Sequence, residues 1–159
     1  MRSVSPARFP SQLHALDFLR RSARRFAVDP RVRETALTIS RSQAFPRDPT
    51  ERADALLRWT RANIAFIPDP YGTEVFQSPA ATLALGAGDC DDHAALLASM
   101  LTSTGIPARL VASGIGGELS HVFPEARLAG RWTAADSTLP RVSLGLLPPH
   151  SKFFATPEG

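Results

Sequence analysis

The sequence predicts an α+β domain, with helices in its N-terminal half and an antiparallel sheet of three or more strands toward its C-terminus. Apolar residues recur at helical spacing in three segments before residue 63 and again in the segment that Cys90 opens. From Ala108 onward, short apolar segments are separated by glycines, which is typical of strands joined by turns. The length of 159 residues and the hydrophobic content of 43% suit one domain with a single core.

The N-terminal half is predicted to hold an extended arm and three helices. Residues 1–12 form the arm, because they contain two prolines and no helical periodicity. A first helix from Leu13 to near Val28 has an apolar stripe on one side and arginines on the other, which we interpret as a solvated face. Asp29-Pro30 starts a second helix that runs through Ile39, and Asp48-Pro49-Thr50-Glu51 starts a third. In both starts a capping aspartate precedes proline, which is favoured at the first helical position.

Shorter elements are predicted between the third helix and Cys90. Residues 64–67 are apolar and β-like, and residues 68–72 form a loop with two prolines and a glycine. Ser78-Pro79 then starts a short helix, which Gly86 ends. The chain therefore turns just before the cysteine.

Cys90, the only cysteine, lies at about the first position of a buried helix that Asp89 caps and that Gly105 and Pro107 end. A thiol there faces unpaired backbone N–H groups and the positive end of the helix dipole, and both favour the nucleophilic thiolate. The helix by itself is equally consistent with a small buried hydrophobe. One cysteine also excludes an intramolecular disulfide and a cysteine-built zinc site, and fits a reducing compartment.

A histidine and an aspartate follow on two predicted strands. Residues 120–128 read as a strand that carries His121, and residues 131–136 as the return strand that ends at Asp136. A cysteine at a helix start, then a histidine and an aspartate on successive strands, is the chain order of a Cys-His-Asp triad. In such a triad His121 takes the thiol proton and Asp136 orients the imidazole. Taken singly, His121 is also consistent with a surface residue or a hydrogen-bonded core residue, and Asp136 with a turn residue.

Four motifs together resemble the transglutaminase-like superfamily, whose members are papain-like cysteine enzymes of acyl transfer. They are Gly-Asp-Cys-Asp-Asp-His-Ala, Gly-Ile-Pro-Ala-Arg, Ser-His-Val-Phe, and Gly-Arg-Trp followed by Asp136. The resemblance spans about Pro49 to Pro140 and is closest to small bacterial and prophage-encoded cysteine peptidases of this kind. It implies a papain-like core with Cys90 as nucleophile, His121 as base and Asp136 as orienting acid. Many members have tryptophan where this chain has Phe123, which bears on local packing and substrate choice.

An oxyanion hole needs donors beside the nucleophile. Gln77, just before the short helix, is our candidate for a side-chain donor that acts with the N–H of Cys90, and Tyr71 is a weaker alternative. The alternative is that Gln77 is a loop residue that faces solvent and has no role in catalysis. His93, three residues after Cys90, is a rival base that we set aside in favour of His121, because a base on a facing strand reaches across a cleft.

Two acidic residues directly follow the cysteine. We interpret Asp91 and Asp92 as partners of the helix dipole. Their charge raises the pKa of a neighbouring thiol, so His121 must supply much of the stabilisation of the thiolate. Related peptidases sometimes bind calcium near such acids, but two adjacent acids are far fewer ligands than calcium takes, so we predict no metal and no cofactor.

The remaining sequence features concern location and partners. No apolar run approaches the ~18 residues of a membrane span, and the N-terminal segment lacks a secretory apolar region, so we expect a cytoplasmic protein, or a virion-associated one if it is phage-encoded. Arginines without interleaved aromatics argue against nucleic-acid binding.

Residues 13–140 are predicted as the catalytic domain and residues 141–159 as a proline-rich extended tail. Its Phe153-Phe154 pair packs on the domain or on a protein partner, or else the end is disordered.

The predicted function is acyl transfer on peptide or isopeptide amides through a thioester on Cys90. We favour hydrolysis, as a peptidase or amidase, over transglutaminase activity, because a chain this short has few segments that could shield a thioester from water. The alternative is a catalytically silent structural or assembly module, for instance in a phage particle. In that case the arm and the tail are binding segments for phage structural proteins.

Overall fold

The structure is a computed structural model, and it describes residues 4–5, 12–45, 47–116 and 118–157. Five helices lie in these residues: α1 (Gln12–Phe26), α2 (Pro30–Arg41), α3 (Pro49–Asn63), α4 (Pro79–Leu85) and α5 (Cys90–Ser103). The predicted caps Asp29, Asp48 and Ser78 each accept a hydrogen bond from a backbone N–H in the first turn of α2, α3 and α4. Within the described residues, no helix has the length and apolar content that a membrane crossing requires.

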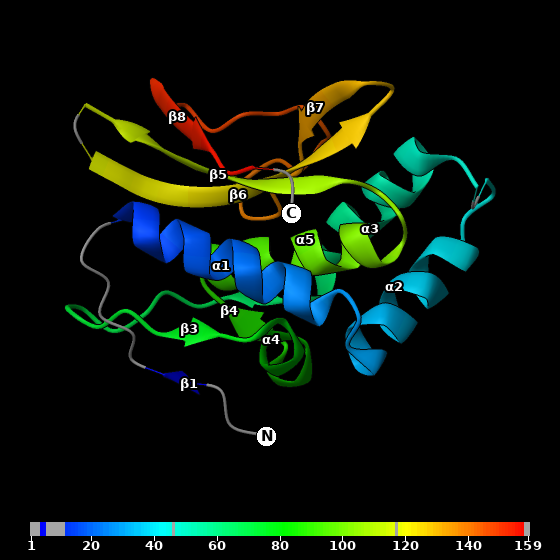
Figure 1. The fold of residues 1–159 in the computed structure, drawn as a ribbon, viewed down its shortest axis with the longest axis horizontal. Helices are drawn as coiled ribbons and strands as arrows, with labels where there is room; N and C mark the ends of the chain where they lie inside the picture. Colours follow the sequence, from blue (N-terminus) through cyan, green and yellow to red (C-terminus); the bar gives the residue numbers. More distant parts are fainter. Residues whose placement is uncertain (1–3, 6–11, 46, 117, 158–159) are drawn as a thin grey trace.

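The described residues also contain eight strands: β1 (Val4–Ser5), β2 (Ala65–Phe66), β3 (Phe76–Gln77), β4 (Ala87–Gly88), β5 (Ala108–Ile115), β6 (Glu118–Leu128), β7 (Arg131–Ala134) and β8 (Lys152–Ala155). The main sheet is antiparallel with the order β7-β6-β5-β8, whereas β1 pairs with β3 and β2 pairs in parallel with β4. Figure 1 shows this sheet along one side of the molecule, with α1 and α5 beneath it. The α+β prediction is therefore confirmed.

Helix α5 lies at the centre of the core. It packs against β6, α1 and α2, and its residues 92–101 are buried without interruption. Leu96, Leu97 and Leu101 are fully enclosed, and burial of each such side chain stabilises the fold by roughly 1.5–3 kcal/mol. A helix enclosed on all sides cannot shift easily, so the core holds Cys90 at a defined place.

Described residues at both chain ends pair with strands of the domain. Most of the predicted arm, residues 1–12, lies outside the described residues. Within it, β1 pairs with β3, and Gln12 already belongs to α1. As far as residue 157, the segment predicted as the tail, residues 141–159, packs on the domain, which is one of the two placements predicted for it. Val142 and Leu144 pack on the core, and β8 extends the main sheet by pairing with β5. An extended, apolar segment beside an open sheet edge satisfies its backbone groups by joining the sheet.

Candidate active site

Cys90 is positioned by a short strand and a helix cap. The parallel pair β2–β4 directs the chain into α5. Asp89 then caps the helix, and its Oδ1 accepts hydrogen bonds from the N–H groups of Asp91 and Asp92 at 3.1 and 3.3 Å. The next N–H, that of His93, donates to the Asp89 carbonyl at 3.0 Å. Cys90 is consequently the first residue of α5, and its free thiol is partly buried.

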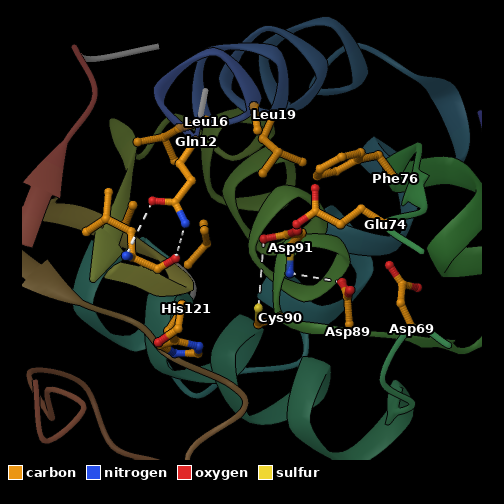
Figure 2. Close-up of a pocket in the computed structure, with 15 residues that line it drawn as sticks. Gln12, Leu16, Leu19, Asp69, Glu74, Phe76, Asp89, Cys90, Asp91 and His121 are labelled. Carbon is orange, nitrogen blue, oxygen red and sulfur yellow. Dashed lines mark hydrogen bonds between the residues drawn. The ribbon is translucent and has the colours of Figure 1, made fainter. Parts of the chain in front are cut away.

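The thiol lies in a cleft of about 490 Å³ between α1, the segment before β3, and β6. Figure 2 shows His121 on one side of the Cys90 sulfur and the carboxyl groups of Asp69, Glu74 and Asp89 on the other. Apolar side chains of α1 and β3 form the remaining wall. The complete lining is Gln12, Ala15, Leu16, Leu19, Asp69, Glu74, Phe76, Asp89, Cys90, Asp91, Ala112, Leu119, Ser120, His121 and Val122.

His121 and Asp136 are in direct contact. The register of β6 and β7 places the end of β7 beside the middle of β6, and the Ala135 N–H donates to the Pro124 carbonyl at 2.9 Å. Asp136, which follows, lies with its Oδ2 2.5 Å from Nε2 of His121. Its Oδ1 accepts hydrogen bonds from the N–H and the hydroxyl of Thr138 at 3.0 and 2.8 Å. A carboxylate held at both oxygens fixes the orientation of the imidazole.

Cys90 and His121 line the same cleft, and the side-chain contact of the thiol there is with Asp91. The backbone of Val122, the residue after His121, lowers the pKa of the Cys90 thiol. Nε2 of His121 is engaged by Asp136, so Nδ1 is the ring nitrogen that this contact leaves available. The side chain of His121 is 15% exposed and that of Asp136 is 1% exposed, so little water competes for their hydrogen bond.

The comparisons with known proteins concern the family and the fold. A family model described as the transglutaminase-like superfamily matches residues 38–137, which is more than half of the chain. This chain belongs to the transglutaminase-like superfamily. The family predicted from the four motifs is therefore confirmed, while none of the comparisons bears on a prophage origin. By sequence, no protein of curated function matches the chain.

Two solved structures share the transglutaminase-like fold of this chain. A "putative protease" from Parabacteroides distasonis is 17% identical with a TM-score of 0.66, and the match covers 82% of this chain and 27% of that one. A "putative cysteine protease" from Cytophaga hutchinsonii is 18% identical with a TM-score of 0.57, and the match covers 83% of this chain and 52% of that one. The chain thus corresponds to only part of each protein, and the likeness concerns the fold.

In this transglutaminase-like chain, Gln77 lies away from the cleft. Its Nε2 donates to Oδ2 of Asp92 at 2.8 Å and to the carbonyl of Ala87 at 3.2 Å, and its backbone N–H donates to Oδ1 of Asp92 at 2.9 Å. Both amide protons are therefore engaged, and we no longer assign Gln77 to the oxyanion hole. Asp92 also accepts from the N–H of Asp89, so it closes a capping box and ties β3 to α5.

The structure also shows the surroundings of His93 and Tyr71, the other residues considered for the site from the sequence. His93 is 1% exposed and points its Nδ1 at the Ser137 hydroxyl, 2.9 Å away, and burial lowers its pKa. It does not line the cleft, and neither does the fully exposed Tyr71. Thr138, which donates two hydrogen bonds to Asp136, was not predicted from the sequence. An aspartate two residues before a threonine is nevertheless a recognisable turn signal. Among the described residues, no three acidic, histidine or cysteine side chains are arranged to hold a metal ion.

The acidic side of the cleft keeps the thiol protonated. Burial raises the pKa of Cys90, the charges of Asp91 and Asp89 raise it further, and the Val122 backbone opposes them. The thiol itself lies 3.8 Å from Oδ1 of Asp91, where it can donate. Burial, followed by the charges of Asp92 and Glu74, also raises the pKa of Asp91 to about 7. Cys90 therefore rests as a neutral thiol beside a carboxyl group that itself titrates near neutral pH.

The raised pKa of Asp91 predicts that the protein is more stable in mild acid than in mild base. Between the usual carboxyl pKa, which applies to the unfolded chain, and about 7, the folded state holds a proton that the unfolded state lacks. Through Asp91, the free energy of unfolding should therefore fall by about 2 kcal/mol as the pH rises from 5 to 7. Burial raises the pKa of Asp89 to about 8, so the loss of its proton continues the fall above pH 7. Urea denaturation at a series of pH values from 5 upward measures this change in the free energy of unfolding.

The matched variant for this prediction is Asp91→Asn. Asparagine keeps the shape of the protonated carboxyl but cannot titrate, so the slope between pH 5 and pH 7 should flatten. A slope in Asp91→Asn equal to that of the unmodified chain would assign the effect to other groups and contradict the prediction.

Proposed function

We propose that the chain is an enzyme of cysteine-dependent acyl transfer on amide substrates. Membership of the transglutaminase-like superfamily supports this chemistry in general. The observation that carries the specific assignment is the 2.5 Å contact of Asp136 with His121, which lines the same cleft as the Cys90 thiol. In this proposal Cys90 is the nucleophile, His121 the general base and acid, and Asp136 the group that orients the imidazole.

The first half of the reaction forms a thioester. Because Cys90 rests as a neutral thiol, Nδ1 of His121 accepts the thiol proton as the sulfur attacks the substrate carbonyl carbon. The C–S bond forms and the carbonyl π electrons move to oxygen. When this oxyanion collapses, the C–N bond breaks and the leaving amine takes the proton from His121. Asp136 stabilises the imidazolium that exists between the two transfers.

The N–H of Cys90 is the donor best placed for the oxyanion. The N–H groups of Asp91, Asp92 and His93 donate to Asp89. This leaves the N–H of Cys90 as the first-turn donor that faces the cleft in the described part of the chain. A backbone donor at a helix N-terminus, adjacent to the attacking sulfur, is suited to a developing negative charge.

The second half of the reaction releases the acyl group to water or to an amine. We favour water, so that the enzyme acts as a peptidase or amidase. Water attacks the thioester while His121 takes one of its protons, the C–S bond breaks, and the sulfur recovers the proton. The cleft reaches the surface beside the exposed Glu74, so solvent can enter it.

Product analysis with labelled water tests both parts of this proposal. A peptide mixture from digested casein is incubated with the protein in ¹⁸O water, with and without methylamine, and examined by mass spectrometry. Hydrolysis is expected to introduce ¹⁸O into new carboxyl groups, and transamidation would instead add methylamide. Neither product should form with Cys90→Ala or His121→Ala, and products that persist in Cys90→Ala would end the proposal.

One observation favours a catalytically silent module instead. Burial and the neighbouring acids raise the pKa of Cys90, which opposes the reactive thiolate. In a silent module, iodoacetamide should label Cys90 at the same rate in the unmodified chain and in His121→Ala. In the enzyme, labelling should slow by about tenfold or more when His121 is lost, because His121 is the proposed acceptor of the thiol proton.

A further inference from the structure

His150 lies outside the matched family region, yet it packs directly on His121. The family model ends at residue 137, and His150 belongs to the segment before β8. The centroids of the two imidazole rings are 5.9 Å apart and their planes are nearly perpendicular, at 82°. His150 is not among the residues that line the cleft, so it contacts the His121 ring without forming part of the cleft wall.

The imidazole of His150 is itself held in place. Its Nδ1 lies 2.8 Å from the hydroxyl of Ser113, a fully buried residue that pairs directly with His121 across β5 and β6. The His150 N–H donates to the Pro148 carbonyl at 2.7 Å, and the next N–H, of Ser151, donates to the Gly114 carbonyl at 3.2 Å. Three hydrogen bonds thus anchor this segment where β8 begins its pairing with β5.

The His121 ring is consequently enclosed by two other rings. Phe123, two residues along β6, stacks on it with a centroid distance of 5.9 Å and an interplanar angle of 27°. His150 contacts it edge-on, in the arrangement that aromatic pairs favour. The hydrogen bond to Asp136 restrains one atom of the imidazole, but the ring can still rotate about that contact. Two neighbouring rings limit this rotation.

We propose that His150 is a positioning residue, which holds the His121 imidazole in the orientation that joins Asp136 to Cys90. The proposal rests on the function proposed above, and it adds a residue supplied by the C-terminal segment of this chain. Small displacements of a catalytic group can cost up to about 100-fold in rate. His150→Ala is therefore expected to slow the reaction of Cys90 with iodoacetamide by roughly 10-fold to 100-fold.

A double variant separates the ring of His150 from its polar atoms. Ser113→Ala with His150→Phe removes both hydrogen-bonding partners together and keeps an aromatic ring against His121, and such paired replacements are often nearly neutral for stability. This variant should react with iodoacetamide at a rate close to that of the unmodified chain. Leu147→Ala, which truncates an exposed side chain of the same segment, is the matched control and should change nothing.

A spectroscopic readout follows the His121 ring without any chemistry. In protein with ¹⁵N-labelled histidine, the Nε2 proton that bonds Asp136 should give a downfield NMR signal, assigned by its loss in His121→Gln. His150→Ala should broaden or remove this signal through faster exchange with solvent, and the double variant should retain it. Circular dichroism verifies that each variant is folded. If His150→Ala does not fold, Ser113→Ala replaces it, with a smaller loss expected in both readouts.

The outcomes are decisive. Unchanged reactivity and an unchanged Nε2 signal in His150→Ala would overturn the proposal, and so would a loss that the double variant fails to restore. If iodoacetamide labelling proves independent of His121, the proposed function fails. The NMR comparison still decides whether His150 positions the ring, because it needs no reaction at Cys90.

Discussion

Asp136→Asn is expected to lower turnover by about 10³-fold to 10⁴-fold while the fold stays intact. The reason lies in the hydrogen bonds of Asp136. Two donors from Thr138 engage its Oδ1, so the carbonyl oxygen of an asparagine would stay there and its NH₂ group would face Nε2 of His121. Nε2 would then have to accept, and the imidazole proton would move to Nδ1. A protonated Nδ1 cannot take the proton of Cys90.

The measurement uses formation of ¹⁸O-labelled product from casein peptides, with the rate of Cys90 alkylation as a second readout. Asp54→Asn is the matched control, because it makes the same chemical change on the exposed face of α3, where Asp54 pairs with Arg58. It should leave both rates unchanged. Asp136→Asn with a rate within about threefold of the unmodified chain would show that the tautomer of His121 is not set by Asp136.

Asp92→Ala is expected to lower the free energy of unfolding by about 3–5 kcal/mol. Asp92 is 1% exposed and accepts hydrogen bonds from the N–H and the side-chain amide of Gln77 and from the N–H of Asp89. Its removal leaves these donors unpaired in the interior, which costs more than the hydrogen bonds themselves contribute. Gly88 shows how closely the site is packed, since a Cβ there would come within 2.5 Å of the Asp92 Cβ.

Urea denaturation measures this loss. Asp92→Asn keeps the shape and part of the acceptor capacity, so its loss should be about half as large or smaller. Asp54→Ala, which breaks an exposed i,i+4 pair with Arg58, should change stability by less than about 0.5 kcal/mol. A loss below about 1 kcal/mol in Asp92→Ala would contradict the structural role given to its carboxylate.

The sequence by itself determined the elements that depend on neighbouring residues. Asp29, Asp48, Ser78 and Asp89 cap their helices as predicted, because a cap is made between residues two or three apart. The helix that Cys90 opens, the strand with His121 and the return strand before Asp136 follow from equally local patterns. The motifs also predicted the superfamily, which the family model confirms.

Only the tertiary structure decided what each side chain does. Asp91 and Asp92 are adjacent, yet one faces the cleft and the other is buried under Gln77. Local sequence predicted dipole partners for both. Gln77 lies 15 residues from Asp92, and His150 lies 37 residues from Ser113. Such pairs depend on how α5 and the sheet pack, and packing sums many weak contacts between distant segments that no local pattern records.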